Sequence, residues 1–169
     1  MSNETEMKDN VREDVYDKEL FDRLLDQNDI DEFRKEFLEL HNYEQSEYFE
    51  DTDDGNRQKI FEFLSPKEVA NFFDQLDFDD DDYESLFDNM DATYASHVLE
   101  EMSYDNAVDI LNELSKPKVA SLLTLMNKDK ANEIKALLHY EEDTAGGIMT
   151  TEFISLKSTT PVKDCLLYT

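Results

Sequence analysis

The chain is poor in basic residues, glycine, proline and cysteine, and it contains no tryptophan. Its 16 Lys and Arg oppose 43 Asp and Glu, which gives a net charge of -27 at pH 7. Such a charge repels phosphate backbones and anionic lipid head groups. We therefore expect that the protein neither binds nucleic acid nor inserts directly into a membrane. Divalent cations and basic protein surfaces are the favoured partners. The alternative is that the acidity only keeps the protein soluble.

Further absences narrow the functional class. Cys165 is the only cysteine, so no internal disulfide can form, and we expect a reducing, cytoplasmic setting. The N-terminus has no apolar signal segment, and no apolar run approaches the about 20 residues of a membrane-spanning helix. Glycine occurs only at 55, 146 and 147, so neither a P-loop nor a G-x-G-x-x-G loop is present. With scattered histidines and no nucleophile–base arrangement, we do not expect an enzyme and assign no catalytic residue.

A twelve-residue repeat of apolar positions runs through the chain. Each unit has an apolar anchor, then a capping residue, then an apolar stripe, as in Leu64, Ser65 and the residues that follow them. "SPKE" at 65–68 is a capping box with proline at the first helical position. The same offsets recur after the anchors Phe78, Met90, Met102 and Leu114, with a two-residue insertion at 77–78, and more loosely after Met126.

A period of twelve predicts short helices of about three turns, joined without linkers. The apolar side chains of such a short helix can be buried only against neighbouring units, so the helices are expected to stack into a superhelix. We assign this domain to residues 19–138, after a disordered acidic N-terminus at 1–18. A junction follows at 139–152. Residues 153–169 then read as a strand and the start of a helix, which is typical of the incomplete beginning of a second domain.

The acidic residues are unevenly distributed. No Lys or Arg occurs in the 48 residues between Lys67 and Lys116, which carry fifteen carboxylates. Asp105 and Asp109 are four residues apart, so both lie on one face of a helix and could hold Mg²⁺ weakly, with water completing its shell. The alternative for this pair is an Asp favoured by the helix dipole next to an exposed Asp. "DFDDDDYE" at 77–84 lacks the glycine of an EF-hand loop, and a solvated acidic loop is favoured there.

The junction "YEEDTAGGIMTTEF" at 140–153 resembles the segment of MgtE-type magnesium transporters that joins a cytosolic helical N domain to two CBS domains. The helical repeat is similar to the superhelix of that N domain and of the flagellar motor protein FliG. The matching junction residues are Tyr140, Glu142, Asp143, Ala145, Gly146, Ile148, Met149, Thr150 and Phe153.

The resemblance implies an all-α, right-handed, armadillo-like superhelix followed by the start of a CBS domain. It implies a regulatory region that senses Mg²⁺ as its cofactor, with the CBS and transmembrane domains and a second copy as partners in the full-length protein. Bound Mg²⁺ would bridge the acidic faces and close the pore. Asp105 and Asp109 correspond to the family's acidic ligand-bearing helix, whereas Asn71 stands where the family can place a Glu ligand. A helical-repeat adaptor for a basic or amphipathic partner is the alternative function.

Overall fold

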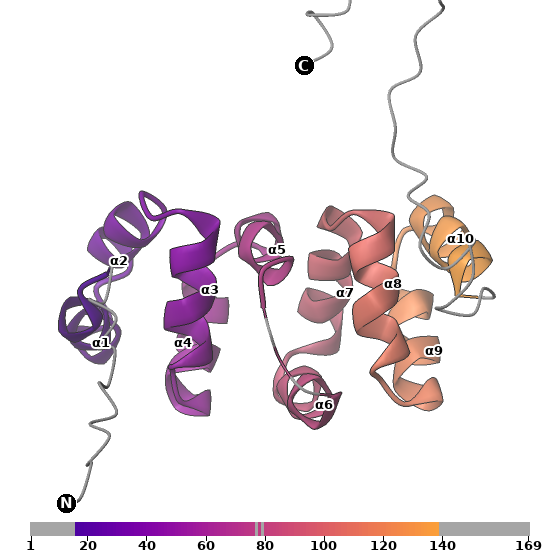
Figure 1. The fold of residues 1–169 in the computed structure, drawn as a ribbon, viewed down its shortest axis with the longest axis horizontal. Helices are drawn as coiled ribbons and strands as arrows, with labels where there is room; N and C mark the ends of the chain where they lie inside the picture. The colour runs from indigo at the N-terminus through magenta and orange to yellow at the C-terminus, as the bar shows by residue number, and fades with distance from the viewer. Residues whose placement is uncertain (1–15, 77, 79, 139–169) are drawn as a thin grey trace, which may run out of the picture.

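The computed structural model describes residues 16–138 except 77 and 79, and for 80 and 81 it describes the backbone alone. This part of the chain is helical throughout and contains no strand. The helices form a row from α1 to α10 (Figure 1). Their bounds are α1 Lys18–Gln27, α2 Ile30–Phe37, α3 Asn42–Glu50, α4 Asp54–Phe63, α5 Pro66–Phe73, α6 Asp80–Asn89, α7 Ala92–Glu101, α8 Tyr104–Asn112, α9 Lys116–Leu125 and α10 Lys128–Leu137.

Packing along the row skips one helix at a time. Helix α3 packs on α5, α5 on α7, and α7 on α9, while α4 packs on α6 and α8 on α10. Helices α1 and α2 pack on each other, and α1 also contacts α4. From α3 onward, the main helix contacts thus join helices two apart in the sequence, so the chain alternates between two layers. This is the stacked all-α arrangement that the repeat predicts.

The predicted helix starts are confirmed, but two of the predicted caps work differently. Asp91 accepts hydrogen bonds from the N–H groups of Thr93 and Tyr94, both at 3.0 Å, and Asn127 caps α10 in the same way. Ser65 and Glu68 form the predicted capping box, with Ser65 N–H donating to Glu68 Oε2 at 2.8 Å. At the starts of α8 and α9, the serines occupy the N-cap position without a side-chain cap hydrogen bond.

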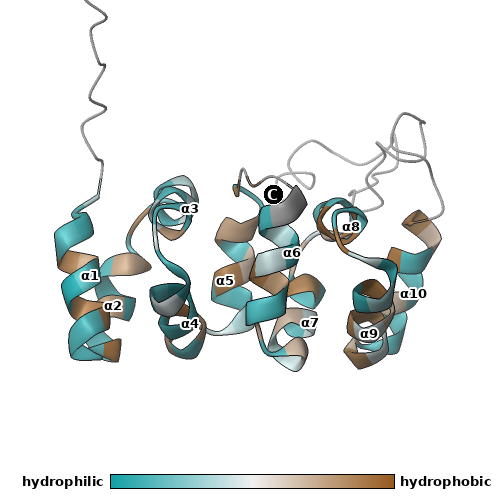
Figure 2. Ribbon diagram, turned by 90° about the horizontal axis from the view of Figure 1, so that it is seen from below, coloured by the Kyte–Doolittle hydropathy of each residue, from teal (hydrophilic) through white to brown (hydrophobic). Residues whose placement is uncertain are grey.

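The buried stripe follows the repeat closely. After Met102, the residues at 107, 108, 110, 111 and 114 are all buried, as the spacing predicts. One predicted stripe residue, Ala120, is exposed because α9 turns it away from its neighbours. In Figure 2, the ribbons of α4 and α6 carry mostly hydrophilic residues, whereas that of α9 carries more hydrophobic ones.

The helical region begins slightly before the predicted boundary at residue 19. Tyr16 is 8% exposed, and its ring meets that of Tyr48 edge-on at 5.7 Å between centroids. Asp17 caps α1 by accepting from Leu20 N–H at 3.0 Å. The predicted disordered segment before residue 16, the junction and the CBS start lie outside the described residues.

Candidate metal-binding surface

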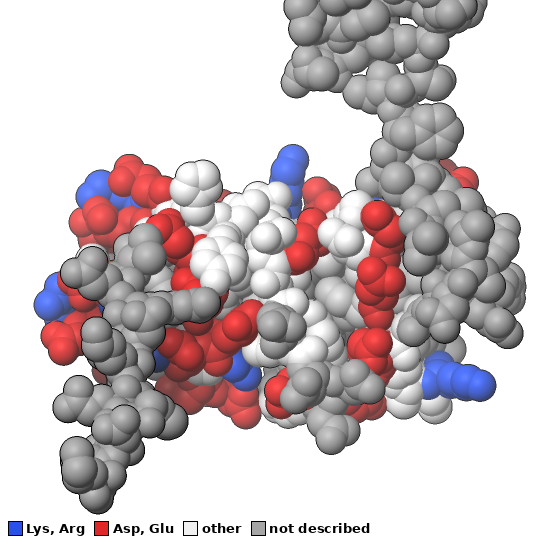
Figure 3. Space-filling view, in the orientation of Figure 1, with Lys and Arg blue, Asp and Glu red and all other residues white. Residues whose placement is uncertain are grey.

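The stretch without Lys or Arg runs from the first turn of α5 to the N-cap of α9. In Figure 3, a line of acidic side chains runs along α8. Asp105, Asp109 and Glu113 recur there at intervals of four residues, with Glu113 as the C-cap of α8. This spacing places the three carboxylates along one side of the helix.

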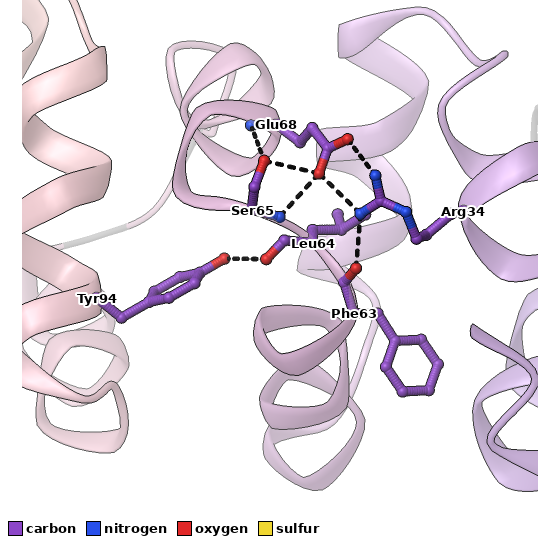
Figure 4. Close-up of polar contacts among 6 residues, drawn as sticks. All are labelled: Arg34, Phe63, Leu64, Ser65, Glu68 and Tyr94. Atoms are coloured by element: carbon purple, nitrogen blue, oxygen red, sulfur yellow. Dashed lines mark hydrogen bonds and ion pairs between the residues drawn. The ribbon is translucent and has the colours of Figure 1, made fainter. Parts of the chain in front are cut away.

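Several of the fifteen carboxylates in this stretch are paired with bases from other helices, which sequence spacing alone did not reveal. Arg34 of α2 donates from Nη2 to Glu68 Oε1 at 2.5 Å and from Nη1 to Glu68 Oε2 at 2.8 Å (Figure 4). Nη1 also donates to the carbonyl of Phe63 at 2.7 Å. The hydrogen bond from Arg34 lowers the pKa of Glu68 to about 2, against the opposing effect of burial. Nearby, Tyr94 Oη donates to the Leu64 carbonyl at 2.8 Å.

A second pair of these carboxylates is bound from α9. Lys118 Nζ lies 3.1 Å from Glu84 Oε1 and 2.8 Å from Asp88 Oδ1. Glu84 also accepts from the N–H of Ser115 at 2.9 Å and from its hydroxyl at 3.0 Å. Although the stretch contains no Lys or Arg, bases from outside it pair with Glu68, Glu84 and Asp88. These three carboxylates therefore have structural roles, and those along α8 remain among the candidates for binding a cation.

Asp105 stands in the first turn of α8, where the helix dipole favours a negative charge. Its Oδ1 is buried and has no hydrogen-bond partner. A buried carboxylate oxygen without a donor costs free energy, because the water it gave up is not replaced. The predicted interaction with the helix dipole accounts for the position of Asp105, but it gives this oxygen no hydrogen-bond donor. A bound cation would supply the missing partner.

Asp74 is the neighbour that sequence reasoning did not single out. It is the C-cap of α5, and its carboxylate accepts a hydrogen bond from the Asn106 side chain. Partial burial raises the pKa of Asp74, the repulsion of Asp105 raises it further, and the Asn106 hydrogen bond opposes both. Thirty-one positions separate Asp74 from Asp105 in the sequence, so no local spacing could have brought them together. Within the described residues, neither forms an ion pair.

The other predicted ligand, Asp109, lies one turn further along α8 and is exposed. The structure thus places Asp105 and Asp109 on one helix, as their spacing predicts, and adds Asp74 beside Asp105. In the described part of the chain, no three His, Cys, Asp or Glu side chains converge into a complete metal site. Carboxylates with this sparse arrangement can hold a hydrated Mg²⁺ through one or two oxygens, with other ligands coming from water or another domain.

Comparisons with known proteins agree with this architecture. Residues 40–143 match the family described as the MgtE intracellular N domain. Over 137 residues the chain is 45% identical to the magnesium transporter MgtE of Enterococcus faecalis (strain ATCC 700802 / V583); the match covers 81% of this chain and 30% of that protein. The chain therefore spans about a third of the length of this curated relative.

Two solved structures have the same fold. One is the crystal structure of the soluble part of a magnesium transporter, with a TM-score of 0.83 and 41% identity over 89% of this chain and 59% of that one. The other is the cytosolic domain of the Mg²⁺ channel MgtE in complex with ATP, with a TM-score of 0.74. At 21% identity over 89% of this chain and 61% of that one, the second likeness concerns the fold alone. No described helix is long and apolar enough to cross a membrane.

Proposed function

The chain belongs to the MgtE intracellular N domain family, and from this membership we propose that it is the Mg²⁺-sensing regulatory region of a magnesium transporter. The region would act inside the cell, as the family description states for its members. It would regulate the passage of Mg²⁺ without carrying the ion itself. CBS domains, transmembrane domains and a second copy of the protein are its proposed partners.

The observation that carries the proposal is the buried, unpartnered Oδ1 of Asp105 beside the Asp74 carboxylate. Mg²⁺ prefers oxygen ligands and keeps several waters, so it can bridge carboxylates that do not meet directly. Asp109 extends the same side of α8 by one turn. Asn71, which supplies no charge, lies three positions before Asp74 in the C-terminal part of α5. Asp74 therefore places a carboxylate at the end of α5, about one turn after Asn71, the position at which the resemblance allows a Glu ligand.

The proposed mechanism follows from the charge of this surface. Without Mg²⁺, the carboxylates of α8 repel the acidic surface of a neighbouring domain and keep the two apart. Mg²⁺ replaces this repulsion with shared oxygen ligands, so the domains approach. In the complete transporter, this compaction would close the pore when internal Mg²⁺ is high. The described surface contributes only part of the shell, so the region alone is expected to bind weakly, on the order of millimolar.

The decisive experiment uses a longer chain that includes both CBS domains. Small-angle scattering is recorded across a Mg²⁺ titration at constant ionic strength. The unaltered protein should compact, and Asp105→Asn with Asp109→Asn should remove most of the change in the radius of gyration. Asp74→Asn should shift the midpoint to higher Mg²⁺.

The matched control is Glu32→Gln with Glu36→Gln in α2, which has the same four-residue spacing. There Lys35 Nζ lies 2.9 Å from Glu32 Oε1 and 2.8 Å from Glu36 Oε1, so both carboxylates already share one ammonium group. This control should compact like the unaltered protein. If the α8 variant also compacts normally, the Mg²⁺ site lies elsewhere and the proposed role of α8 is wrong.

The alternative function, an adaptor for a basic partner, has no particular residue in its favour. An acidic surface is expected for either function, so it does not distinguish them. The family membership favours the role in a magnesium transporter. A basic peptide that competes with Mg²⁺ for the α8 side, in a chain that fails to compact with Mg²⁺, would favour the adaptor.

A further inference from the structure

A groove opens at the last turn of the stack, between α8, α9 and α10. Its volume is about 520 Å³. The walls include Leu111, Leu114 and Leu123, which are largely buried, together with Val119 and Leu138, which are partly exposed. The groove is thus apolar inside, and it lies where no further described helix follows to cover it.

Two lysines, Lys116 of α9 and Lys135 of α10, also line this groove, and both are exposed. They belong to a local reversal of charge, because residues 115–138 carry more basic than acidic side chains in a chain of net charge -27. An acidic and partly apolar occupant fits such a groove. The residues that produce the reversal are Lys116, Lys118, Lys128, Lys130 and Lys135, against Asp129 and Glu133.

The sequence that directly follows α10 has this chemistry. Leu138 lines the groove, and the next residues are His139, Tyr140, Glu141, Glu142 and Asp143. They lie outside the described residues. Since a chain spans at most about 3.6 Å per residue, the Cα of Tyr140 is within ~7 Å of that of Leu138 and the Cα of Asp143 within ~18 Å. A segment of this length can therefore reach the groove beside Leu138 while α10 keeps its position.

We propose that residues 139–143 dock in the groove between α8, α9 and α10 and cover the end of the stack. Tyr140 fills the apolar part, and its hydroxyl stays near water, as tyrosine does at half-buried positions. Glu141, Glu142 and Asp143 face Lys116 and Lys135. Because the segment is tethered at Leu138, its effective concentration at the groove is in the millimolar range, so even modest contacts hold it.

Docking would give the junction a mechanical purpose. A repeat stack needs a terminal unit that covers its last apolar face, and here the connecting segment serves as that unit. It would also fix the direction in which the following domain leaves the stack. The inference does not depend on Mg²⁺ binding, so it can be tested in a chelator and judged separately from the proposed function.

The absence of tryptophan makes the test direct, because one introduced indole reports alone. In the full chain with EDTA, Tyr140→Trp should show blue-shifted emission and a quenching constant by acrylamide about threefold lower than Tyr168→Trp, as a largely buried ring requires. Lys116→Glu with Lys135→Glu should abolish this difference. Reversing Glu141→Lys and Glu142→Lys in that background should restore it.

The matched control is Lys67→Glu with Lys128→Glu, two exposed lysines outside the groove, which should leave the emission unchanged. Circular dichroism establishes that each variant keeps its helices. An emission from Tyr140→Trp that equals that of Tyr168→Trp overturns the proposal. A blue shift that vanishes on dilution also overturns it, because the occupant is then the same segment of a second copy. A blue shift that ignores the lysine reversals means that the ring is buried elsewhere.

Discussion

Helices α1–α5 pack around aromatic rings, whereas α7–α10 pack around aliphatic side chains. Phe37 is fully buried and contacts four rings, those of Phe21, Phe33, Tyr48 and Phe72, at centroid distances of 5.0–5.9 Å. In the described part of the chain, no ring pair lies beyond Tyr94.

In the second half, the fully buried positions are occupied by residues such as Val98, Leu99 and Ile134. The same helix spacing thus accepts two kinds of core. Each aromatic ring covers a large area, so a few rings fill the core of the first helices. Smaller aliphatic side chains fill the closely repeated units, where α7, for example, packs on both α5 and α9.

The largest expected effect is in the aromatic half. Phe37→Ala removes a ring with four ring neighbours and should lower the free energy of unfolding by about 4 kcal/mol. Ile134→Ala, at a fully buried site in the last helix, should cost about 2–3 kcal/mol, because an isoleucine side chain removes fewer buried atoms than a phenylalanine ring. Urea unfolding followed by circular dichroism measures both. Equal losses of unfolding free energy would mean that the aromatic core does not stabilise the fold more than the aliphatic core.

Next in size is the ion pair that joins the first helices. Glu68→Gln should cost about 2 kcal/mol at pH 7, because Arg34 loses a charged partner that is largely shielded from water. The folded pKa of Glu68, about 2, lies below the ordinary value of 4.5. The stability it supplies is therefore present above about pH 4.5 and is lost as the pH falls toward 2. Thermal melts of both proteins should converge over that window.

The corresponding ion pair in the second half joins α6 to α9. Glu84 is paired with Lys118, and the N–H of Ser115 is the main cause of its lowered pKa. Its side chain is more exposed than that of Glu68, at 35% against 22%. Glu84→Gln should therefore destabilise less than Glu68→Gln, and more salt should erase a larger part of its effect. A larger loss at Glu84 would contradict the ranking of the two halves.

A smaller difference is expected between two helix caps. Ser65→Ala removes a hydroxyl that caps α5 and should cost about 1 kcal/mol. Ser115→Ala should cost about 0.5 kcal/mol, because that hydroxyl makes no cap hydrogen bond and donates only to the Glu84 carboxylate. Chemical denaturation of the two variants checks the order. An equal cost would mean that Ser115 caps α9 in solution.

The smallest effect concerns Asp74. Burial and the Asp105 charge raise its pKa in the fold, so its ionised form is disfavoured there. Its unfavourable contribution is absent below its unfolded pKa and grows as the pH rises through the folded value. Asp74→Asn keeps an acceptor for Asn106 and should raise Tm by about 1 °C at pH 7 without Mg²⁺. Differential scanning calorimetry at pH 7 and pH 3 should show the gain only at the higher pH.

Much of the fold could be predicted from the spacing of apolar residues. The anchors, caps and stripes after Met90 and Met102 lie in the structure where the repeat places them. Helix geometry is local, since each backbone hydrogen bond joins residues four apart, so a period of twelve is enough to define the helices and their buried faces. The α8 placement of Asp105 and Asp109 follows from the same local rule. Their role as Mg²⁺ ligands stays a prediction.

The set of helices, their buried stripes and the segregation of acidic from basic residues can all be read from the amino-acid sequence. The three-dimensional packing of the helices was needed to show that Arg34 pairs with Glu68, that Lys118 pairs with Glu84, and that the charge of Asp105 acts on Asp74. These pairs join residues about 30 positions apart or more. Their meeting depends on how far each helix is rotated relative to the next, and that rotation is set by junction backbone angles and side-chain packing between layers, which no single helix period encodes.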